Sequence, residues 1–243
     1  MDRLATPAVS FKDNLLLSNL SAEVRDRLMD DSRLEHLDLA KVLFEPGQPI
    51  EYVYFPLSGV ISLVTILIEG DLIEMATVGC EGLVGAPMTY DPAKGSNARG
   101  VSQIEGDSIR VPVRVFRTEL ARSPELAGLV NQFSYALFSL VGQNAACNRL
   151  HNIEKRCARW LLMTRDRVEE DRFHLTQEFL SQMLGARRAS VTEAAAALQE
   201  AGAISYARGE ITIRDRAMLE GMSCECYEVV RRAFDRLYGD PSA

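Results

Sequence analysis

The chain has 243 residues, which is long enough for two domains of ordinary size. Hydrophobic residues make up 47% and charged residues 25%, as is typical of a globular protein with buried cores. No run approaches the roughly 18 uninterrupted apolar residues of a membrane span, and the first residues lack the basic start and apolar run of a signal peptide. These features predict a cytoplasmic protein with no membrane partner.

The formal net charge of −7 is unevenly distributed along the chain. Residues 1–151 contain 13 basic and 19 acidic residues, whereas residues 152–243 contain 14 basic and 15 acidic residues. The C-terminal part is therefore nearly neutral, and its basic residues are almost all arginine. Because binding to nucleic acid needs a local basic face rather than a basic whole, the negative net charge does not exclude it.

Five cysteines are scattered through the sequence: Cys80, Cys147, Cys157, Cys224 and Cys226. Their odd number and the expected reducing compartment favour free thiols over a disulfide framework. Cys224 and Cys226 do not have C-x-x-C spacing, and no second pair has the spacing of metal ligands. We therefore predict no metal site and no cofactor. Three histidines, with no Ser/His/Asp set and no glycine-rich phosphate loop, also predict no catalytic site.

The N-terminal part begins with helical periodicity and then changes to strands. Residues 18–31 have the amphipathic pattern of a short helix, with Ser21 at the N-cap position. From about 36 to 115, short runs rich in Val, Ile, Tyr, Phe and Leu are separated by turn signals such as Pro46-Gly47. Alternating apolar residues end this series at Val113. Many short strands separated by Gly and Pro predict a barrel or sandwich.

A long helix is predicted to start at Ser123-Pro124-Glu125, with Pro at its first position. Apolar residues then recur with the heptad spacing of a two-stranded coiled coil, which would join two copies of the chain. On the pattern alone, an amphipathic helix packed on its own domain is the favoured alternative. A second helix is expected after a hinge near 148–152. The predicted dimer interface consists of Leu126, Val130, Phe133, Leu137, Leu140, Asn144 and Cys147.

Residues 174–213 give the clearest indication of function. Thr176 is placed to cap a short helix, Gly185 to make a turn, and a second helix to run from about 187–189 to Gln199. Two runs typical of β-strands follow, joined by a turn at 207–210. This order predicts a helix-turn-helix with a β-hairpin wing, and therefore double-stranded DNA as a partner.

A recognition helix enters the major groove by its N-terminal end, so basic and polar side chains there are expected to contact bases and phosphates. Arginine suits this role because its planar guanidinium group can make two parallel hydrogen bonds. Arg208, in the predicted wing turn, is placed to contact a phosphate. The alternative is an ordinary helical hairpin with solvated arginines. The predicted DNA-binding residues are Thr176, Gln177, Arg187, Arg188, Ser190, Thr192, Glu193 and Arg208.

From about residue 15 to 215, the order of these elements resembles the Crp/Fnr superfamily of bacterial regulators. The segments FEPGQPIEYVYFPLSGVISL and TQEFLSQMLGARRASVTEAAAALQEAGAI are the strongest matches. The resemblance implies an α+β fold with three parts: a jelly-roll-like sensor β-roll over 1–117 that is similar to cyclic-nucleotide-binding domains, a dimerisation helix and hinge over 118–152, and a winged helix-turn-helix over 153–243. It also implies a homodimeric transcription regulator that binds near-palindromic operators, with RNA polymerase and a small-molecule effector as further candidate partners.

The sequence departs from this family at the ligand site. Cyclic-AMP-responsive members have a Gly-Glu pair for the ribose and an Arg-Ser pair for the phosphate; here Ala86 follows Gly85, and Ser96-Asn97 takes the place of Arg-Ser. Losing that Arg removes charge-assisted hydrogen bonds worth about 1.5–3 kcal/mol each, so we expect no cyclic-AMP binding of the usual kind. Cysteine and histidine positions also fit neither the iron–sulfur nor the haem sensors of the family. The candidate effector residues are Cys80, Glu81, Gly85, Ala86, Ser96, Asn97 and Arg99.

Two further expectations concern the C-terminal part. The family's Arg-Glu-…-Arg recognition set corresponds here to Arg188, Ala189 and Glu193, which predicts a different operator sequence. Residues 215–238 have the pattern of one last amphipathic helix, which either caps the DNA-binding domain or presents its arginines to a partner. The alternative function is a β-roll that regulates a protein partner without binding DNA.

Overall fold

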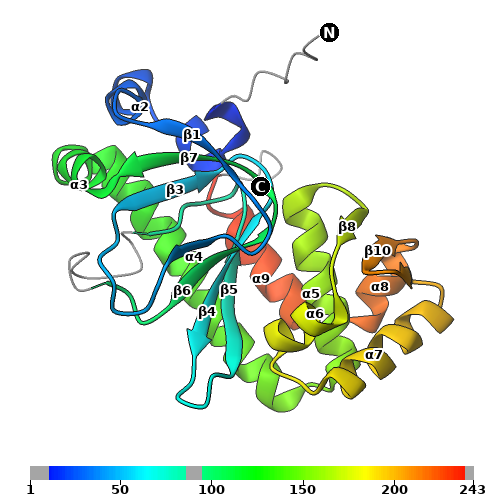
Figure 1. Cartoon of the computed structure of the whole chain (residues 1–243). Coiled ribbons are helices and arrows are strands. Elements are labelled where there is room, and N and C mark those ends of the chain that lie inside the picture. The colour runs from blue at the N-terminus through cyan, green and yellow to red at the C-terminus, as the bar shows by residue number, and fades with distance from the viewer. Residues whose placement is uncertain (1–10, 86–94, 239–243) are drawn as a thin grey trace, which may run out of the picture.

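The computed structural model describes residues 11–85 and 95–238. Figure 1 shows an N-terminal β domain, a long helix beside it, and a C-terminal helical domain with a small sheet of its own. This arrangement confirms the predicted α+β fold, with its β-roll, central helix and winged helix-turn-helix. No helix in the described part of the chain combines the length and apolar content needed to cross a lipid bilayer.

The β domain consists of two antiparallel sheets. One has the strand order β1-β7-β3, and the other has the order β2-β6-β4-β5. The strands are β1 (Arg33–Leu37), β2 (Val42–Phe44), β3 (Tyr52–Pro56), β4 (Val60–Ile66), β5 (Leu72–Val78), β6 (Arg99–Ile104) and β7 (Gly106–Pro112). Val53, Phe55 and Val111 are fully buried between the sheets and the helices, because alternate residues of a strand face the core.

The last predicted strand ends earlier than its alternating pattern indicates. Pro112 pairs with Tyr52 as the final residue of β7, and Val113 begins α3 (Val113–Arg122). The Val113 N–H still donates to the Glu51 carbonyl at 2.8 Å, so pairing with the β3 side ends only where the chain turns into α3. The ring of Phe116 on α3 then packs on Phe55 with 6.2 Å between centroids, which fixes α3 on the sheet.

The N-terminal segment packs against the β domain and the long helix. It contains the 3-10 turn η1 (Phe11–Asp13), α1 (Leu15–Ser18) and α2 (Ala22–Met29). Ser21 is the N-cap of α2, as predicted, but its hydroxyl makes no cap hydrogen bond. It donates instead to the Glu125 carboxylate at 2.7 Å and so connects α2 to the start of the long helix.

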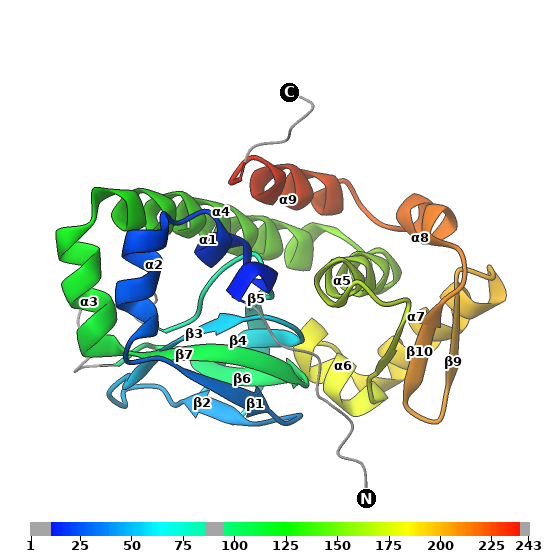
Figure 2. The same cartoon turned by 90° about the horizontal axis from the view of Figure 1, so that it is seen from above.

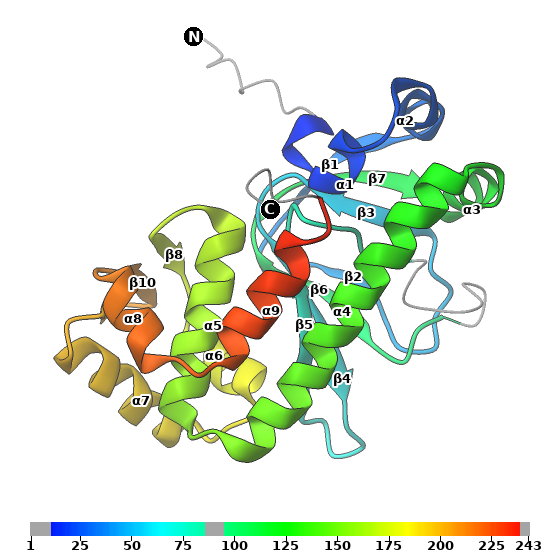
Figure 3. The same cartoon turned by 180° about the vertical axis from the view of Figure 1, so that it is seen from behind.

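That long helix, α4 (Pro124–Leu150), begins as predicted, with the Ser123 hydroxyl accepting from the Leu126 N–H. Figures 2 and 3 show α4 running along the β domain toward the C-terminal domain. Gly82 allows this close approach, because a Cβ atom at that position would overlap the ring of Phe133. Residues His151 and Asn152 separate α4 from α5, at the predicted break.

The C-terminal domain surrounds α5 (Ile153–Val168), whose central turns are buried. A three-stranded antiparallel sheet, in the order β8-β10-β9, closes one side of it. The remaining elements are β8 (Arg172–His174), α6 (Gln177–Leu184), α7 (Arg188–Glu200), β9 (Ile204–Ala207), β10 (Glu210–Ile213) and α8 (Arg216–Met222).

The C-terminal segment forms two helices where the sequence predicted one. Residues 223–225 form a link between α8 and α9 (Cys226–Asp235). While α8 packs on α5 within the C-terminal domain, α9 leaves that domain and lies along α4, as Figure 3 shows. The Phe234 ring of α9 lies 6.4 Å from that of Phe133. The prediction of one continuous helix was therefore wrong, because periodicity continues through the link although the backbone turns.

Candidate DNA-binding surface

The helix-turn-helix has the geometry that its sequence predicts. Thr176 caps α6 by accepting a hydrogen bond from the Phe179 N–H at 3.1 Å. Gly185 ends α6 in the left-handed conformation, with φ 55° and ψ 44°, which glycine adopts without steric cost. The buried side chains of Leu180, Val191 and Leu198 hold α6 and α7 against the rest of the domain.

A groove between the start of α7 and the β9–β10 hairpin brings together four of the eight predicted DNA-binding residues. Thr176, Gln177, Arg188 and Arg208 line this groove. The Thr192 hydroxyl lies 3.0 Å from Gln177 Oε1 and ties α7 to the first residue of α6. The groove is therefore built from the helix pair and from the hairpin together.

Both arginines of the groove are exposed to solvent. The Arg188 side chain is 67% exposed, and the acidic group paired with it, Glu178, lies 4.0 Å away. Arg208 and Gly209 both have positive φ angles, 53° and 77°, as a two-residue type I′ hairpin turn requires. This turn places the exposed Arg208 at the tip of the wing.

The other predicted residues are distributed differently. Arg187 lines a separate groove between the helix-turn-helix and the β4–β5 hairpin, so it faces the β domain rather than the wing. Ser190 is half-buried and Glu193 is exposed on α7. The sequence prediction did not include Tyr206 and His174, which also line the groove of Arg188. The Tyr206 hydroxyl donates to the Leu175 carbonyl at 2.8 Å, and strand alternation on β9 could have identified its position.

Comparison with known families supports this part of the structure. Residues 155–222, which span α5 to α8, match the family of Crp-like helix-turn-helix domains. No curated protein matches the chain in sequence.

Solved structures extend the similarity to nearly the whole chain. A protein from Eubacterium rectale, assigned to the Crp/Fnr family of transcriptional regulators, has 18% sequence identity and a TM-score of 0.67, covering 85% of this chain and 96% of its own. The chain has the Crp/Fnr fold. FixK2 from Bradyrhizobium japonicum matches with 14% identity, a TM-score of 0.67, and coverage of 79% and 98%. A Crp-family transcriptional regulator from Thermus thermophilus matches with 19% identity, a TM-score of 0.65, and coverage of 78% and 96%.

In this Crp/Fnr-type chain, the candidate effector residues near Gly85 make internal contacts. The Glu81 carboxylate accepts from Arg167 of α5 at 2.7 Å and from the Gly79 N–H at 2.9 Å. Burial raises the pKa of the Cys80 thiol to about 12, so this thiol stays protonated at neutral pH and is a poor sensor of oxidants. Gly85 is buried, and Ala86 lies outside the described residues.

The second group of candidate effector residues lies near β2 and β6 and is also internally bonded. Arg99 forms an ion pair with Glu45 at 2.9 Å. The buried Ser96 hydroxyl accepts from the Ala98 N–H, whereas Asn97 is exposed. In this arrangement Arg99 is already paired with a carboxylate rather than directed toward a phosphate.

The predicted dimer interface needs a correction. Its seven side chains, at positions 126, 130, 133, 137, 140, 144 and 147, are at most 7% exposed, because they pack on the chain's own β domain, α5 and α9. The heptad series thus identifies the buried face of α4, which was the alternative left open. The exposed face has a different heptad series, in which Tyr135 and Phe138 are each 74% exposed.

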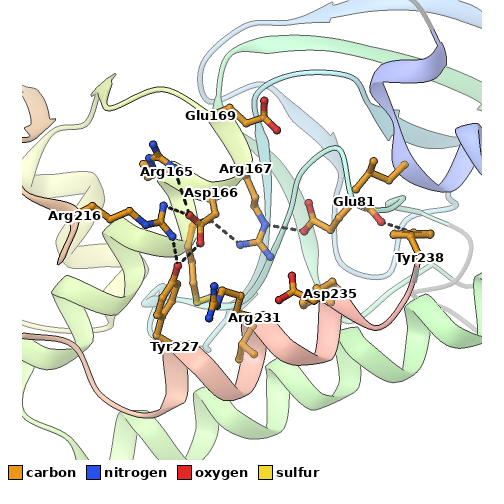
Figure 4. A pocket seen from close by; sticks show the side chains of 14 residues that line it. Glu81, Arg165, Asp166, Arg167, Glu169, Arg216, Tyr227, Arg231, Asp235 and Tyr238 are labelled. Carbon is orange, nitrogen blue, oxygen red and sulfur yellow. Dashed lines mark hydrogen bonds and ion pairs between the residues drawn. The ribbon is translucent and has the colours of Figure 1, made fainter. Parts of the chain in front are cut away.

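A pocket between the domains brings Glu81, a candidate effector residue, together with polar residues that the sequence did not indicate (Figure 4). Glu81 from the β domain, Arg167 from α5 and Tyr238 after α9 meet there, with the Tyr238 hydroxyl donating to the Glu81 carbonyl at 2.5 Å. On the other side of the pocket, Asp166 accepts from Arg216 of α8 and from the Tyr227 hydroxyl of α9, both at 2.6 Å. These bonds join the β domain, α5 and both C-terminal helices.

A second polar contact between the domains is centred on Glu74 of β5. Its carboxylate accepts from the Trp160 indole N–H of α5 at 2.8 Å and lies 2.7 Å from the Ser62 hydroxyl. The Ser62 hydroxyl also lies 2.6 Å from Gln103 Oε1. Burial raises the pKa of Glu74 to about 7, against the smaller lowering effects of these hydrogen bonds and of nearby arginines.

Proposed function

We propose that the chain is a transcription regulator that binds near-palindromic DNA operators as a homodimer, with a regulatory rather than a catalytic role. The observation that supports this most strongly is the groove of Arg188 and Arg208, in which the start of α7 and the tip of the wing present two unburied guanidinium groups on one surface. In this proposal α7 is the recognition helix and β9–β10 is the wing.

The start of α7 suits a polyanion for two reasons. The N-terminus of a helix has unsatisfied N–H groups and a partial positive charge, and the N-cap and first residue of α7 are both arginine. The major groove of B-DNA, about 12 Å wide, admits a helix whose first turn reaches the base edges. We assign Arg188, Thr192 and Glu193 to base contacts, and Arg208 to a phosphate beside the groove.

Dimerisation is assigned to the exposed face of α4. Gly128, Asn131, Tyr135, Phe138 and Gly142 follow one another at alternating spacings of three and four residues, which is the spacing of a coiled-coil seam. A Cβ atom at either glycine would meet open space, so a second helix can approach closely there. Two recognition helices would then enter successive major grooves about 34–36 Å apart.

The β-roll is assigned a regulatory role without cyclic-AMP binding of the usual kind. Arg99, the arginine nearest the expected phosphate position, already pairs with Glu45. Rotating it toward a phosphodiester would break that ion pair. An unidentified small-molecule effector and RNA polymerase complete the proposed set of partners.

The test is a selection of genomic DNA fragments by the purified protein without ligand, followed by fluorescence anisotropy with the selected site. We expect a palindromic site, bound equally with and without cyclic AMP, and weakened in Arg188→Ala. Arg114→Ala, on the exposed surface of α3, is the control that should bind normally. If no site is selected and the salt-sensitive binding to random duplex that phosphate contacts produce is also absent, the alternative of a β-roll acting on a protein partner replaces this proposal.

A further inference from the structure

Four potential metal ligands, far apart in the sequence, meet where α4 ends. Cys147 lies in the last turn of α4, and His151 is the residue that follows this helix. Cys224 and Cys226 come from the link between α8 and α9 and from the first residue of α9. One ligand atom from each of the four lies within 4.8 Å of the other three. This cluster, Cys147, His151, Cys224 and Cys226, is called the Cys3His cluster below.

The distances within the Cys3His cluster are those of ligands around one tetrahedral ion. Zinc–sulfur bonds of about 2.3 Å place two sulfur ligands of a tetrahedral ion about 3.8 Å apart. The sulfur atoms of Cys147 and Cys224 lie 3.6 Å apart, and Cys226 Sγ lies 3.5 Å from His151 Nδ1. A disulfide would need a sulfur–sulfur distance of about 2.05 Å, and all five cysteines are free thiols.

The surroundings of the cluster match those of a metal site. The three cysteines are at most 5% exposed and form a small buried group separate from the main core. His151 presents Nδ1 to the cluster, while its Nε2 lies 3.4 Å from the Glu225 carboxylate. A carboxylate on the distal nitrogen is the usual partner of a metal-bound histidine, because it fixes the ring orientation and tautomer. Gln143 donates a hydrogen bond to Cys226 Sγ at 3.0 Å, a contact that stabilises a thiolate.

We propose that Cys147, His151, Cys224 and Cys226 bind one structural zinc ion, which fixes the start of α9 to the end of α4. Binding removes one proton from each of the three thiols, and Zn²⁺ with three thiolates and a neutral imidazole has a net charge of −1. The positive charges of Arg156 and Arg159 both interact with Cys147. This interaction would offset part of that negative charge, and the buried Nε atoms of both arginines have no hydrogen-bond partner among the described residues.

Other metal chemistry fits the cluster less well. Thiolate ligands select soft or borderline ions, which excludes the oxygen-preferring Mg²⁺ and Ca²⁺. Four protein ligands fill a tetrahedral zinc ion completely, which is typical of a structural rather than a catalytic site. The ion would lie directly before Asn152, where the chain enters α5 and the DNA-binding domain. It would therefore fix how α9 and that domain are positioned on α4.

The first experiment measures metal content and cobalt absorbance on the full-length protein, purified under reducing conditions without a histidine tag. We expect one zinc per chain by mass spectrometry of the metal. Exchange for Co²⁺ should give the intense visible absorbance of a tetrahedral ion and a thiolate-to-cobalt charge-transfer band. Cys226→Ser should weaken this band and lower zinc affinity. Cys80→Ser, which changes a thiol outside the cluster, should leave both unchanged.

A second variant keeps the test valid if a cysteine change prevents folding. Glu225 contacts the cluster only through His151, and its side chain is 74% exposed, so Glu225→Gln should fold normally. It should lower zinc affinity about 10- to 100-fold, as loss of a histidine's carboxylate partner typically does. Absence of stoichiometric zinc or cobalt from folded, reduced protein would overturn the proposal. So would a Cys147–Cys224 disulfide, seen as a loss of two hydrogens in the intact mass, in protein kept under these reducing conditions.

Discussion

Replacing Glu74 with glutamine should stabilise the protein at pH 8, although it removes a group bonded to both domains. The Ser62 hydroxyl has one proton but faces two acceptors, Glu74 Oε2 and Gln103 Oε1. A protonated Glu74 satisfies this arrangement, because its O–H can donate to Ser62 while Ser62 donates to Gln103. Glutamine at position 74 reproduces this protonated form, with its amide N–H donating to Ser62 and its oxygen accepting from Trp160.

The magnitude follows from the pKa of Glu74, which burial raises from 4.5 to about 7. Each pKa unit corresponds to about 1.4 kcal/mol, so the shift represents about 3 kcal/mol. In the unfolded chain Glu74 loses its proton near pH 4.5, whereas in the folded chain it keeps the proton until about pH 7. The folded state therefore binds more protons between these values, and this contribution to stability falls as pH rises through the window and is constant above it. The charges of Arg159 and Arg167 act on Glu74 from α5 and limit the effect.

Chemical denaturation from pH 4.5 to pH 8 tests this reasoning on the wild type, Glu74→Gln and the control Glu69→Gln. Glu69 lies in the exposed turn of the same hairpin, so its replacement should leave the pH profile unchanged. The difference between Glu74→Gln and the wild type should grow with pH and reach about 2–3 kcal/mol in favour of glutamine at pH 8. Parallel profiles, or a variant less stable than the wild type at pH 8, would refute the assignment of a buried, protonated Glu74.

Three further predictions concern DNA binding and assembly. Arg188→Ala should weaken binding to the selected operator by about 1–3 kcal/mol and relax specificity at one base pair, whereas an unchanged footprint would remove it from the base-contacting residues. Arg208→Ala should weaken binding to all DNA sequences and make the plot of log affinity against log salt concentration less steep by about 1. An unaltered slope would show that Arg208 does not contact a phosphate. Phe138→Arg should convert a dimer into a monomer in sedimentation equilibrium. The control Leu34→Arg, at an exposed apolar position of β1, should leave the dimer intact. A Phe138→Arg protein that is still dimeric would show that the interface lies elsewhere than on this face of α4.

Local signals made the helix-turn-helix predictable from sequence. Thr176 as a cap, Gly185 as a left-handed turn and Gly202 after α7 each act within a few residues of their own position. The positions that such signals determine agree with the structure. The start of α4 at Ser123-Pro124 agrees for the same reason.

Contacts between segments far apart in the sequence could not be predicted from such local signals. A heptad series on α4 shows that one face is buried but not whether its partner is another copy or the same chain, so the buried residues were assigned to the wrong partner. Cys147 and Cys224 are 77 residues apart, and no spacing rule connects them. The partners of Glu81 were missed likewise, since Arg167 lies 86 residues away.

The return of α9 to α4 also determines when the protein can finish folding during synthesis. Contacts between Phe133 and Phe234, and between Glu81 and Tyr238, join segments about 100 or more residues apart. The β-roll can form its sheets while the chain is still being translated, because β1 to β7 are complete by residue 112. The part of α4 that α9 contacts cannot be covered until α9 has left the ribosome. Until then the Phe133 ring lacks its contact with Phe234, and the apolar surface that α9 buries stays open to solvent.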